Sequence, residues 1–167
     1  MLRPKIIITG PESSGKTTLC QALSKHFKIP FSKEYARQYL NVIKKKYTQT
    51  DLLIIAKTQL KSEKEAAILD TDLITIKIWS NEKYGKCDKW ILEQINKQKN
   101  KNRIYLLCKP DLPWQDDPLR ENPKDRMRLF EIYKKELSNL GHNYYIISKK
   151  NRDYKYLAKR LSKKILI

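Results

Sequence analysis

The chain has 167 residues, of which 40% are hydrophobic and 32% charged, which is the size and composition of one globular domain. Its apolar runs are far shorter than the ~20 residues that span a bilayer, the N-terminus lacks the features of a secretory signal, and three widely spaced cysteines support neither a disulfide framework nor a zinc site. We therefore expect a single cytoplasmic domain over 1–167 without a membrane partner. The net charge of +18 would by itself favour a nucleic-acid partner.

Strands and helices alternate along the chain, which predicts an α/β domain. In chain order the pattern predicts a strand over 5–9, a helix over 16–27, a strand over 29–32, helices over 34–46 and 51–65, a strand over 66–69, helices over 73–79 and 88–98, a strand over 103–108, a helix over 124–140, a strand over 144–147 and a C-terminal helix. Thr50 is the expected cap of the helix over 51–65. Five parallel strands with helical crossovers make a three-layer α/β/α fold, whose ligands lie beyond the carboxyl ends of the strands.

The densest basic stretch, 149–164, lies in the expected C-terminal helix. The apolar residues at helical spacing, which leave the lysines on the solvated side, are Tyr154, Leu157, Ala158, Leu161 and Ile165. Lysine also greatly outnumbers arginine in the chain, whereas base recognition favours arginine. We therefore expect a solvated basic surface and no nucleic-acid partner.

Residues 10–17, GPESSGKT, match the phosphate-binding pattern G-x-x-x-x-G-K-[ST] between an expected strand and an expected helix. Glycines let backbone amides wrap a phosphate closely, and the helix N-terminus adds a positive dipole. The motif predicts a P-loop NTPase fold with ATP and Mg²⁺ as cofactors. Lys16 would reach the β- and γ-phosphates, Thr17 would hold Mg²⁺ and Thr18 would lie near the α-phosphate. The residues expected to bind the ATP phosphates are Gly10, Glu12, Ser13, Ser14, Gly15, Lys16, Thr17 and Thr18.

Asp70 and Asp72 follow the third expected strand, and residues two apart on an extended segment project to the same side. We expect Asp70 to act on Mg²⁺, through water, and Asp72 to contact the hydroxyl of the phosphate acceptor as a catalytic residue. The alternative is that both only cap the next helix.

Glu34, with Arg37 three residues on, follows the second expected strand at the rim of the same crevice. Glu34 is the other candidate base, because a carboxylate there can accept the proton of a substrate hydroxyl. Arg37 could steady Glu34 or a phosphate. An ordinary surface ion pair is the alternative.

A segment with four prolines, 110–123, cannot hold a long helix, and its length indicates a functional loop. The loop carries Arg120, and Arg126 and Arg128 follow at its exit. Arginine makes bidentate contacts with a transferring phosphoryl group, and a loop that closes would exclude water. We expect a lid over about 110–128, with Arg120 and Arg126 as catalytic residues. The alternative is a solvated connector.

Several sequence blocks together resemble the kinase domain of NadR-type proteins. A GTPase, the competing class of P-loop protein, would carry an N-K-x-D tetrapeptide and a D-x-x-G motif after the third strand. The chain has neither motif, so we do not expect a GTPase. The blocks that carry the resemblance, in order, are 10–18 (GPESSGKTT), 33–37 (KEYAR), 70–80 (DTDLITIKIWS), 84–87 (YGKC) and 110–117 (PDLPWQDD) with Arg120 and Glu121. The third and fifth blocks are the specific ones, since the first fits any P-loop kinase.

The resemblance implies a phosphotransferase that uses ATP to phosphorylate the 5′-hydroxyl of nicotinamide riboside, giving nicotinamide mononucleotide for NAD salvage. Trp79 and Tyr84 could then bracket the cationic nicotinamide ring, although both aromatic side chains could equally belong to the core. Glu34, Arg37 and Asp72 would complete the substrate site, and Arg152 would lie on the adenine side. Another nucleoside kinase, or a P-loop ATPase module that binds nucleic acid, remains the alternative function.

Three features depart from the family pattern. No segment precedes the first strand, so we expect no adenylyltransferase activity in this chain. Asp117 stands where a glycine commonly follows the loop aspartate, and the loop after the fifth strand lacks the glycine expected near the adenine. The oligomeric state, the preferred nucleoside and the phosphate donor are left open by the sequence.

Overall fold

A five-stranded parallel sheet organises the protein, which is described by a computed structural model over residues 4–43, 46–99 and 101–165. The strands are β1 (Lys5–Thr9), β2 (Phe31–Ser32), β3 (Ile68–Asp70), β4 (Arg103–Cys108) and β5 (Asn143–Ile147). Their order across the sheet is β2-β3-β1-β4-β5. The sheet therefore extends from β1 in both directions, which opens a crevice at the carboxyl end of β1.

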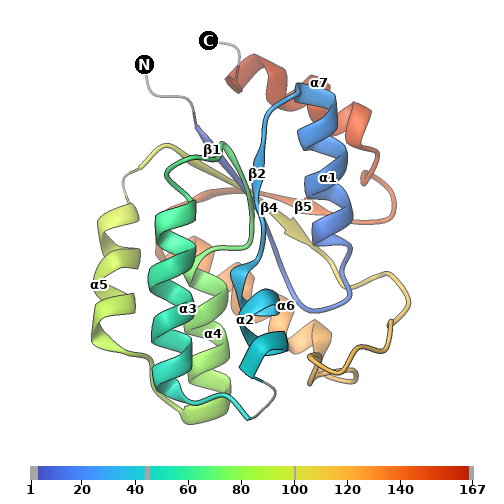
Figure 1. Ribbon diagram of the computed structural model, residues 1–167. Coiled ribbons are helices and arrows are strands. Elements are labelled where there is room, and N and C mark those ends of the chain that lie inside the picture. Colours follow the sequence, from blue (N-terminus) through green and yellow to red (C-terminus); the bar gives the residue numbers. More distant parts are fainter. Residues whose placement is uncertain (1–3, 44–45, 100, 166–167) are drawn as a thin grey trace.

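Helices cover both faces of the sheet and make the three layers predicted from the sequence. They are α1 (Lys16–Phe27), α2 (Tyr35–Ile43), α3 (Gln49–Ser62), α4 (Leu73–Tyr84), α5 (Lys89–Gln98), α6 (Arg126–Asn139) and α7 (Tyr154–Ile165). Helices α1 and α7 pack against each other on one face, whereas α3, α4 and α5 lie together on the other (Figure 1). In the described part of the chain, no helix has both the length and the apolar character needed to cross a membrane.

Alternating side chains of the central strands build two separate cores. On β1, Ile6 and Ile8 point into the core shared with α1 and α7, whereas Ile7 points into the core shared with α2 to α6. All three are 1% exposed or less, as expected for a strand covered on both faces. This burial explains why the apolar run of β1 was recognisable from its sequence.

Tertiary contacts shift several predicted element boundaries. Helix α3 begins two residues earlier than expected, because Thr48 and Asp51 form a reciprocal capping box, so the expectation that Thr50 caps this helix is wrong. Helix α4 continues past Trp79 to Tyr84 and ends at Gly85, whose φ of 69° closes the helix. Residues 44–45 of the helix expected over 34–46 lie outside the described residues.

The two short strands also differ from their predicted ranges. Strand β2 begins at Phe31 rather than at residue 29, because the Ile29 amide donates to the Ser24 carbonyl and so belongs to the end of α1. Strand β3 covers 68–70 rather than 66–69. The carbonyl of Ala66 accepts a hydrogen bond from Lys5, which fixes the turn that follows α3.

Candidate active site

The segment between β1 and α1 forms a phosphate-binding loop at the crevice. Gly10 has φ 135° and lies so close to β4 that an added Cβ would be 2.6 Å from the Cys108 carbonyl oxygen. Gly15 precedes α1 with φ 79°, and no side chain of the described residues caps this helix. The first-turn amides of α1 therefore remain available to an anion. The Nζ of Lys16 lies over the loop and donates to the Pro11 carbonyl at 2.7 Å.

Thr17 and Asp70 form the part of the site that suits a metal ion. The Thr17 hydroxyl donates to Oδ2 of Asp70 at 2.6 Å. Asp70 is 2% exposed, and its Oδ1 has no hydrogen-bond partner among the described residues. Burial raises the pKa of the Asp70 carboxyl, while the Thr17 hydrogen bond opposes this shift. A buried carboxylate oxygen without a partner beside a threonine hydroxyl fits the oxygen ligands that Mg²⁺ prefers.

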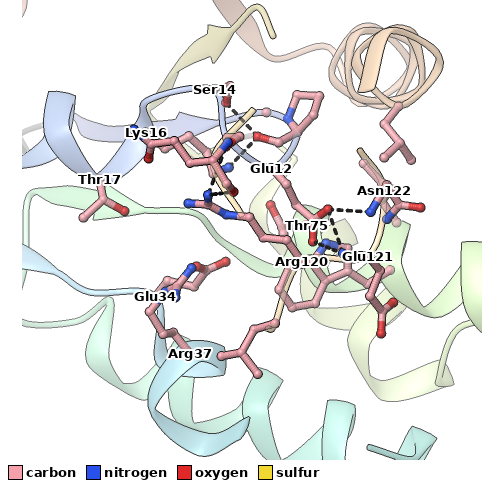
Figure 2. Close-up of a pocket in the computed structure, with 18 of the residues that line it drawn as sticks. Glu12, Ser14, Lys16, Thr17, Glu34, Arg37, Thr75, Arg120, Glu121 and Asn122 are labelled. Atoms are coloured by element: carbon pink, nitrogen blue, oxygen red, sulfur yellow. Dashed lines mark hydrogen bonds between the residues drawn. The ribbon is translucent and has the colours of Figure 1, made fainter. Parts of the chain in front are cut away.

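A cavity of about 500 Å³ opens from the phosphate-binding loop. Its walls come from α2, α4, α6 and the proline-rich loop over 109–125, which contains no helix or strand. Figure 2 shows Glu34 and Arg37 on one side of this cavity and Thr75 across it. The cavity therefore joins a place for phosphates to a second place for another molecule.

Glu34 lies in this cavity just before α2, as expected. Burial raises the pKa of its carboxyl, and the positive charge of Lys16 partly offsets the shift. The next residue, Tyr35, is held by a hydrogen bond from its amide to Gln59 Oε1 at 2.9 Å. The backbone that carries Glu34 is thus anchored to α3, which is the kind of support that a catalytic carboxylate needs.

Arg37 pairs with the proline-rich loop rather than with Glu34. Its guanidinium donates to Asp117 Oδ2 at 2.6 Å, across 80 residues of sequence. The Leu119 amide and then Arg37 lower the pKa of the Asp117 carboxyl. Asp117, the residue that departs from the family pattern, therefore ties the loop to α2.

The proline-rich loop lies directly on the phosphate-binding loop. Ser13 Oγ accepts hydrogen bonds from the Gln115 amide at 2.9 Å and from Arg120 Nη1 at 3.0 Å. The Ser13 carbonyl accepts one from Arg126 at 3.1 Å. Arg120 and Arg126, the two arginines selected from the sequence, are thus brought to the same short segment.

Glu12 makes the other contact between the two loops. Its carboxylate accepts hydrogen bonds from the backbone amides of Glu121, at 3.2 Å, and Asn122, at 3.0 Å (Figure 2). The sequence predicted Glu12 only as a member of the phosphate-binding loop. Its negative charge is instead directed at two amides of the proline-rich loop.

Arg152 lies behind the phosphate-binding loop. Its Nη1 donates to the Ser14 carbonyl at 2.6 Å, and its Nη2 pairs with Asp111 at 3.0 Å. The guanidinium is 3.1 Å from where a Cβ on Gly15 would lie. The residue expected on the adenine side therefore also braces the loop that precedes α1.

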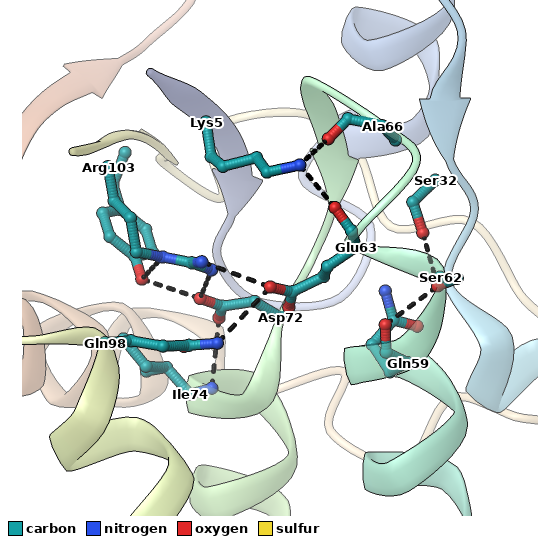
Figure 3. A network of polar contacts seen from close by, with 11 residues as sticks. Lys5, Ser32, Gln59, Ser62, Glu63, Ala66, Asp72, Ile74, Gln98 and Arg103 are labelled. Atoms are coloured by element: carbon teal, nitrogen blue, oxygen red, sulfur yellow. Dashed lines mark hydrogen bonds and ion pairs between the residues drawn. The ribbon is translucent and has the colours of Figure 1, made fainter. Parts of the chain in front are cut away.

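Asp72 is not brought into the cavity, which corrects the expectation that it contacts the acceptor. It is 0% exposed and accepts hydrogen bonds from Arg103 Nη2 at 2.9 Å, the Tyr105 hydroxyl at 2.7 Å and the Ile74 amide at 3.1 Å (Figure 3). Thr71 has φ 67°, so the segment is not extended and Asp70 and Asp72 point in different directions. The alternative reading, that Asp72 caps the next helix, is the one that the structure bears out.

Of the two aromatic residues expected around the substrate, only Trp79 lines the cavity. The Tyr84 hydroxyl instead donates to the Tyr47 carbonyl at 2.6 Å, and it is the side chain of Tyr47 that reaches the cavity wall. The cavity residues that sequence reasoning missed are Leu40, Tyr47, Thr75, Ile78, Glu82, Lys83, Leu129 and Tyr133. A helical spacing of Thr75, Ile78, Trp79 and Glu82 along α4 was the one signal that could have found some of them.

The fold and the phosphate-binding loop together define a P-loop protein of the α/β/α type. The AAA domain family matches residues 5–155, and the chain belongs to this family. No curated protein matches the chain.

Solved structures with the same fold include kinases. NadR in complex with NR has a TM-score of 0.72 and 20% identity, over 99% of this chain and 52% of the NadR chain. Deoxyadenosine kinase from M. mycoides with bound dCTP has a TM-score of 0.59 and 18% identity, over 95% and 99% of the two chains. Shikimate kinase from Acinetobacter baumannii in complex with shikimate has a TM-score of 0.57 and 16% identity, over 98% and 93%. The chain thus spans about half the length of the NadR chain, and the likeness agrees with the fold that the sequence blocks implied.

Proposed function

We propose that the protein is a kinase that transfers the γ-phosphoryl group of ATP to the 5′-hydroxyl of a nucleoside, and that nicotinamide riboside is this nucleoside. The observation that carries the proposal is that Lys16 of the phosphate-binding loop and the partly buried Glu34 line the same cavity. A carboxylate with a raised pKa beside the phosphate loop suits the removal of a proton from an alcohol.

In the proposed reaction the acceptor oxygen attacks the γ-phosphorus as the bond from this phosphorus to the β,γ-bridging oxygen breaks. The proton of the hydroxyl passes to Glu34, and ADP leaves with the bridging oxygen. Lys16 and the first-turn amides of α1 neutralise charge on the phosphates. Thr17 and Asp70 would hold Mg²⁺, which supplies further charge neutralisation when it is bound.

The proline-rich loop contributes Arg120 in this proposal, and the first residue of α6, directly after the loop, contributes Arg126. Both arginines already contact Ser13, so a small movement of the loop brings a guanidinium to the transferred phosphoryl group. Arginine suits this role because its planar fork contacts two oxygens at once. Residues of the loop also line the cavity, and closure of the loop would exclude water and so favour transfer to the acceptor over hydrolysis.

The choice of nicotinamide riboside is supported by the sequence blocks shared with NadR-type proteins and by the wall of the cavity. Trp79 lines this wall, and an aromatic face attracts a cationic ring such as nicotinamide. Glu82 also lines this wall, and its carboxylate pairs with Arg128. A neutral base can stack on the same Trp79 ring, but it lacks the positive charge on which this electrostatic attraction depends.

An ADP-release assay with a panel of acceptors tests the proposal. Nicotinamide riboside should raise ADP release at least tenfold above the rate with ATP alone, and deoxyadenosine, thymidine and shikimate should raise it less. The Lys16→Ala variant, with unchanged circular dichroism, should lose this activity because Lys16 is the one positively charged side chain in the phosphate-binding loop over 10–17. Equal ADP release with and without every acceptor would refute a kinase. A larger rate with another nucleoside would keep the reaction class and replace the substrate.

A further inference from the structure

The positive charge of this protein is concentrated on one layer of the fold. Residues 17–33, which contain most of α1, and residues 143–165, which contain β5 and α7, hold eleven of the 36 basic residues and one of the 18 acidic residues. About a quarter of the chain thus carries ten of the eighteen net positive charges. A general preference for lysine along the chain would add basic residues to the whole surface. It would not lower the number of acidic residues in one layer of the fold.

These basic side chains are exposed. Helices α1 and α7 pack against each other, so their outer surfaces form one continuous face of the molecule (Figure 1). The exposed basic residues of these two segments are Lys25, Lys28, Lys33, Lys149, Lys150, Lys155, Lys159, Arg160 and Lys163. Lys33 follows β2, at the edge of the sheet opposite β5, and the others belong to α1, α7 and the turns next to them. None of these lysines forms an ion pair among the described residues. The layer's acidic residue, Asp153, accepts a hydrogen bond from the Lys155 amide at the start of α7.

A groove of about 420 Å³ lies in the same layer, between β5 and α7. Tyr145 and Tyr156 line it, together with Asn151 and Arg160, whereas the Tyr144 side chain packs against the core on the other face of the sheet. Tyr156 is 51% exposed, and the Arg160 guanidinium lies 4.3 Å from the centre of the Tyr145 ring. The groove therefore combines aromatic faces with a basic rim, which consists of Arg160 and of exposed lysines that neighbour the lining residues in the sequence, Lys149, Lys150, Lys155 and Lys159.

We infer that this groove and its basic rim bind single-stranded nucleic acid. Lysines along a groove neutralise phosphates, and bases that are not paired stack on tyrosine and arginine faces. This inference departs from the expectation, drawn from the sequence, that the lysines are only a solvated surface. What the structure adds is the placement of the tyrosines beside them.

The alternative polyanions fit the face less well. A duplex keeps its bases stacked on one another, so they cannot stack on the tyrosines that line the groove. An anionic membrane would favour a helix with an exposed apolar stripe, whereas Leu157, Ala158 and Leu161 of α7 are all buried against the sheet. The single strand is the occupant that uses both the charge and the aromatic rings.

Binding is measured by fluorescence anisotropy with a labelled 20-nucleotide single-stranded RNA at several potassium chloride concentrations. Four phosphate contacts predict a slope of about −3 for the logarithm of the association constant against the logarithm of the salt concentration. The double substitution Lys155→Ser with Lys159→Ser should weaken binding at least tenfold and reduce the slope by about 1.4. Its matched control is Lys89→Ser with Lys97→Ser, which removes two exposed lysines of α5 on the opposite face and should change neither quantity.

Tyr156 distinguishes stacking from charge alone. Tyr156→Ala should weaken binding of the RNA at least fivefold and leave binding of heparin unchanged, whereas Tyr156→Phe should bind the RNA like the parent protein. The inference is overturned if the RNA does not bind, if the α5 control loses as much affinity, or if Tyr156→Ala has no effect. It is also overturned if vesicles of phosphatidylserine and phosphatidylcholine bind and the RNA does not. None of these residues lies at the active site, so ADP release by each variant shows separately whether the kinase proposal holds.

Discussion

The buried carboxylate of Asp72 allows a sharp test of what this residue does. Asp72 is 0% exposed and faces Arg103, which is 6% exposed and has Glu63 as its other carboxylate partner at 3.2 Å. In Asp72→Asn the amide oxygen can still accept from the Ile74 amide, so the start of α4 survives. What is lost is the charge that balances Arg103 and the strong acceptor for the Tyr105 hydroxyl.

Removal of one partner from a buried ion pair costs about 3–5 kcal/mol, because the other charge stays buried and unpaired. Glu63 remains beside Arg103, which places the expected loss at the lower end, about 3 kcal/mol. A domain of this size has a urea m-value of about 1–3 kcal/mol/M. The midpoint of urea unfolding should therefore fall by roughly 1 to 3 M.

Circular dichroism against urea measures this shift, and Asp88→Asn is the matched control. Asp88 caps α5 with the same kind of bond, from the Trp90 amide at 2.8 Å, but it is exposed and has no ion pair among the described residues. The control should lose no more than about 1 kcal/mol. Folded Asp72→Asn should also keep its turnover. A midpoint like that of the parent protein, combined with a hundredfold loss of turnover, would refute this reasoning and return Asp72 to the acceptor site.

Three further predictions concern the cavity. Glu34→Gln should lower turnover by about 10² to 10⁴ with little change in ATP affinity. Burial raises the pKa of the Glu34 carboxyl above its usual 4.5, and the ionised carboxylate is the base, so turnover of the parent enzyme should fall as the pH drops through this raised pKa. Turnover that does not change with pH in this range would contradict the role of Glu34 as the base. Glu12→Ala leaves the Glu121 and Asn122 amides without their hydrogen-bond acceptor. Turnover should therefore fall about tenfold, while the dissociation constant of ATP changes less than threefold. Equal losses of turnover and of ATP affinity would instead assign Glu12 to nucleotide binding. Arg120→Ala and Arg126→Ala should lower turnover more than ATP affinity, and lysine should restore neither fully, since it lacks the bidentate geometry; small, equal effects would make the proline-rich loop a connector.

The sequence by itself determined the features that depend on neighbouring residues. The phosphate-binding loop was recognisable because its glycines, lysine and threonine are consecutive, and their chemistry requires that order. Strands β1 and β4 were found at their observed bounds because strands covered on both faces need unbroken runs of apolar residues. The fold class followed from the alternation of such strands with helices.

The tertiary structure alone decided which distant residues meet. Asp72 was assigned wrongly because its role depends on Arg103 and Tyr105, which arrive from a strand more than thirty residues away, and on the positive φ of Thr71, which an ordinary threonine does not predict. The contact of Arg37 with Asp117 likewise joins residues 80 apart. A local sequence pattern indicates the conformation of a short segment. The partner of a buried charged side chain depends instead on tertiary packing, because only the folded chain brings distant groups close enough to compensate for the loss of hydration.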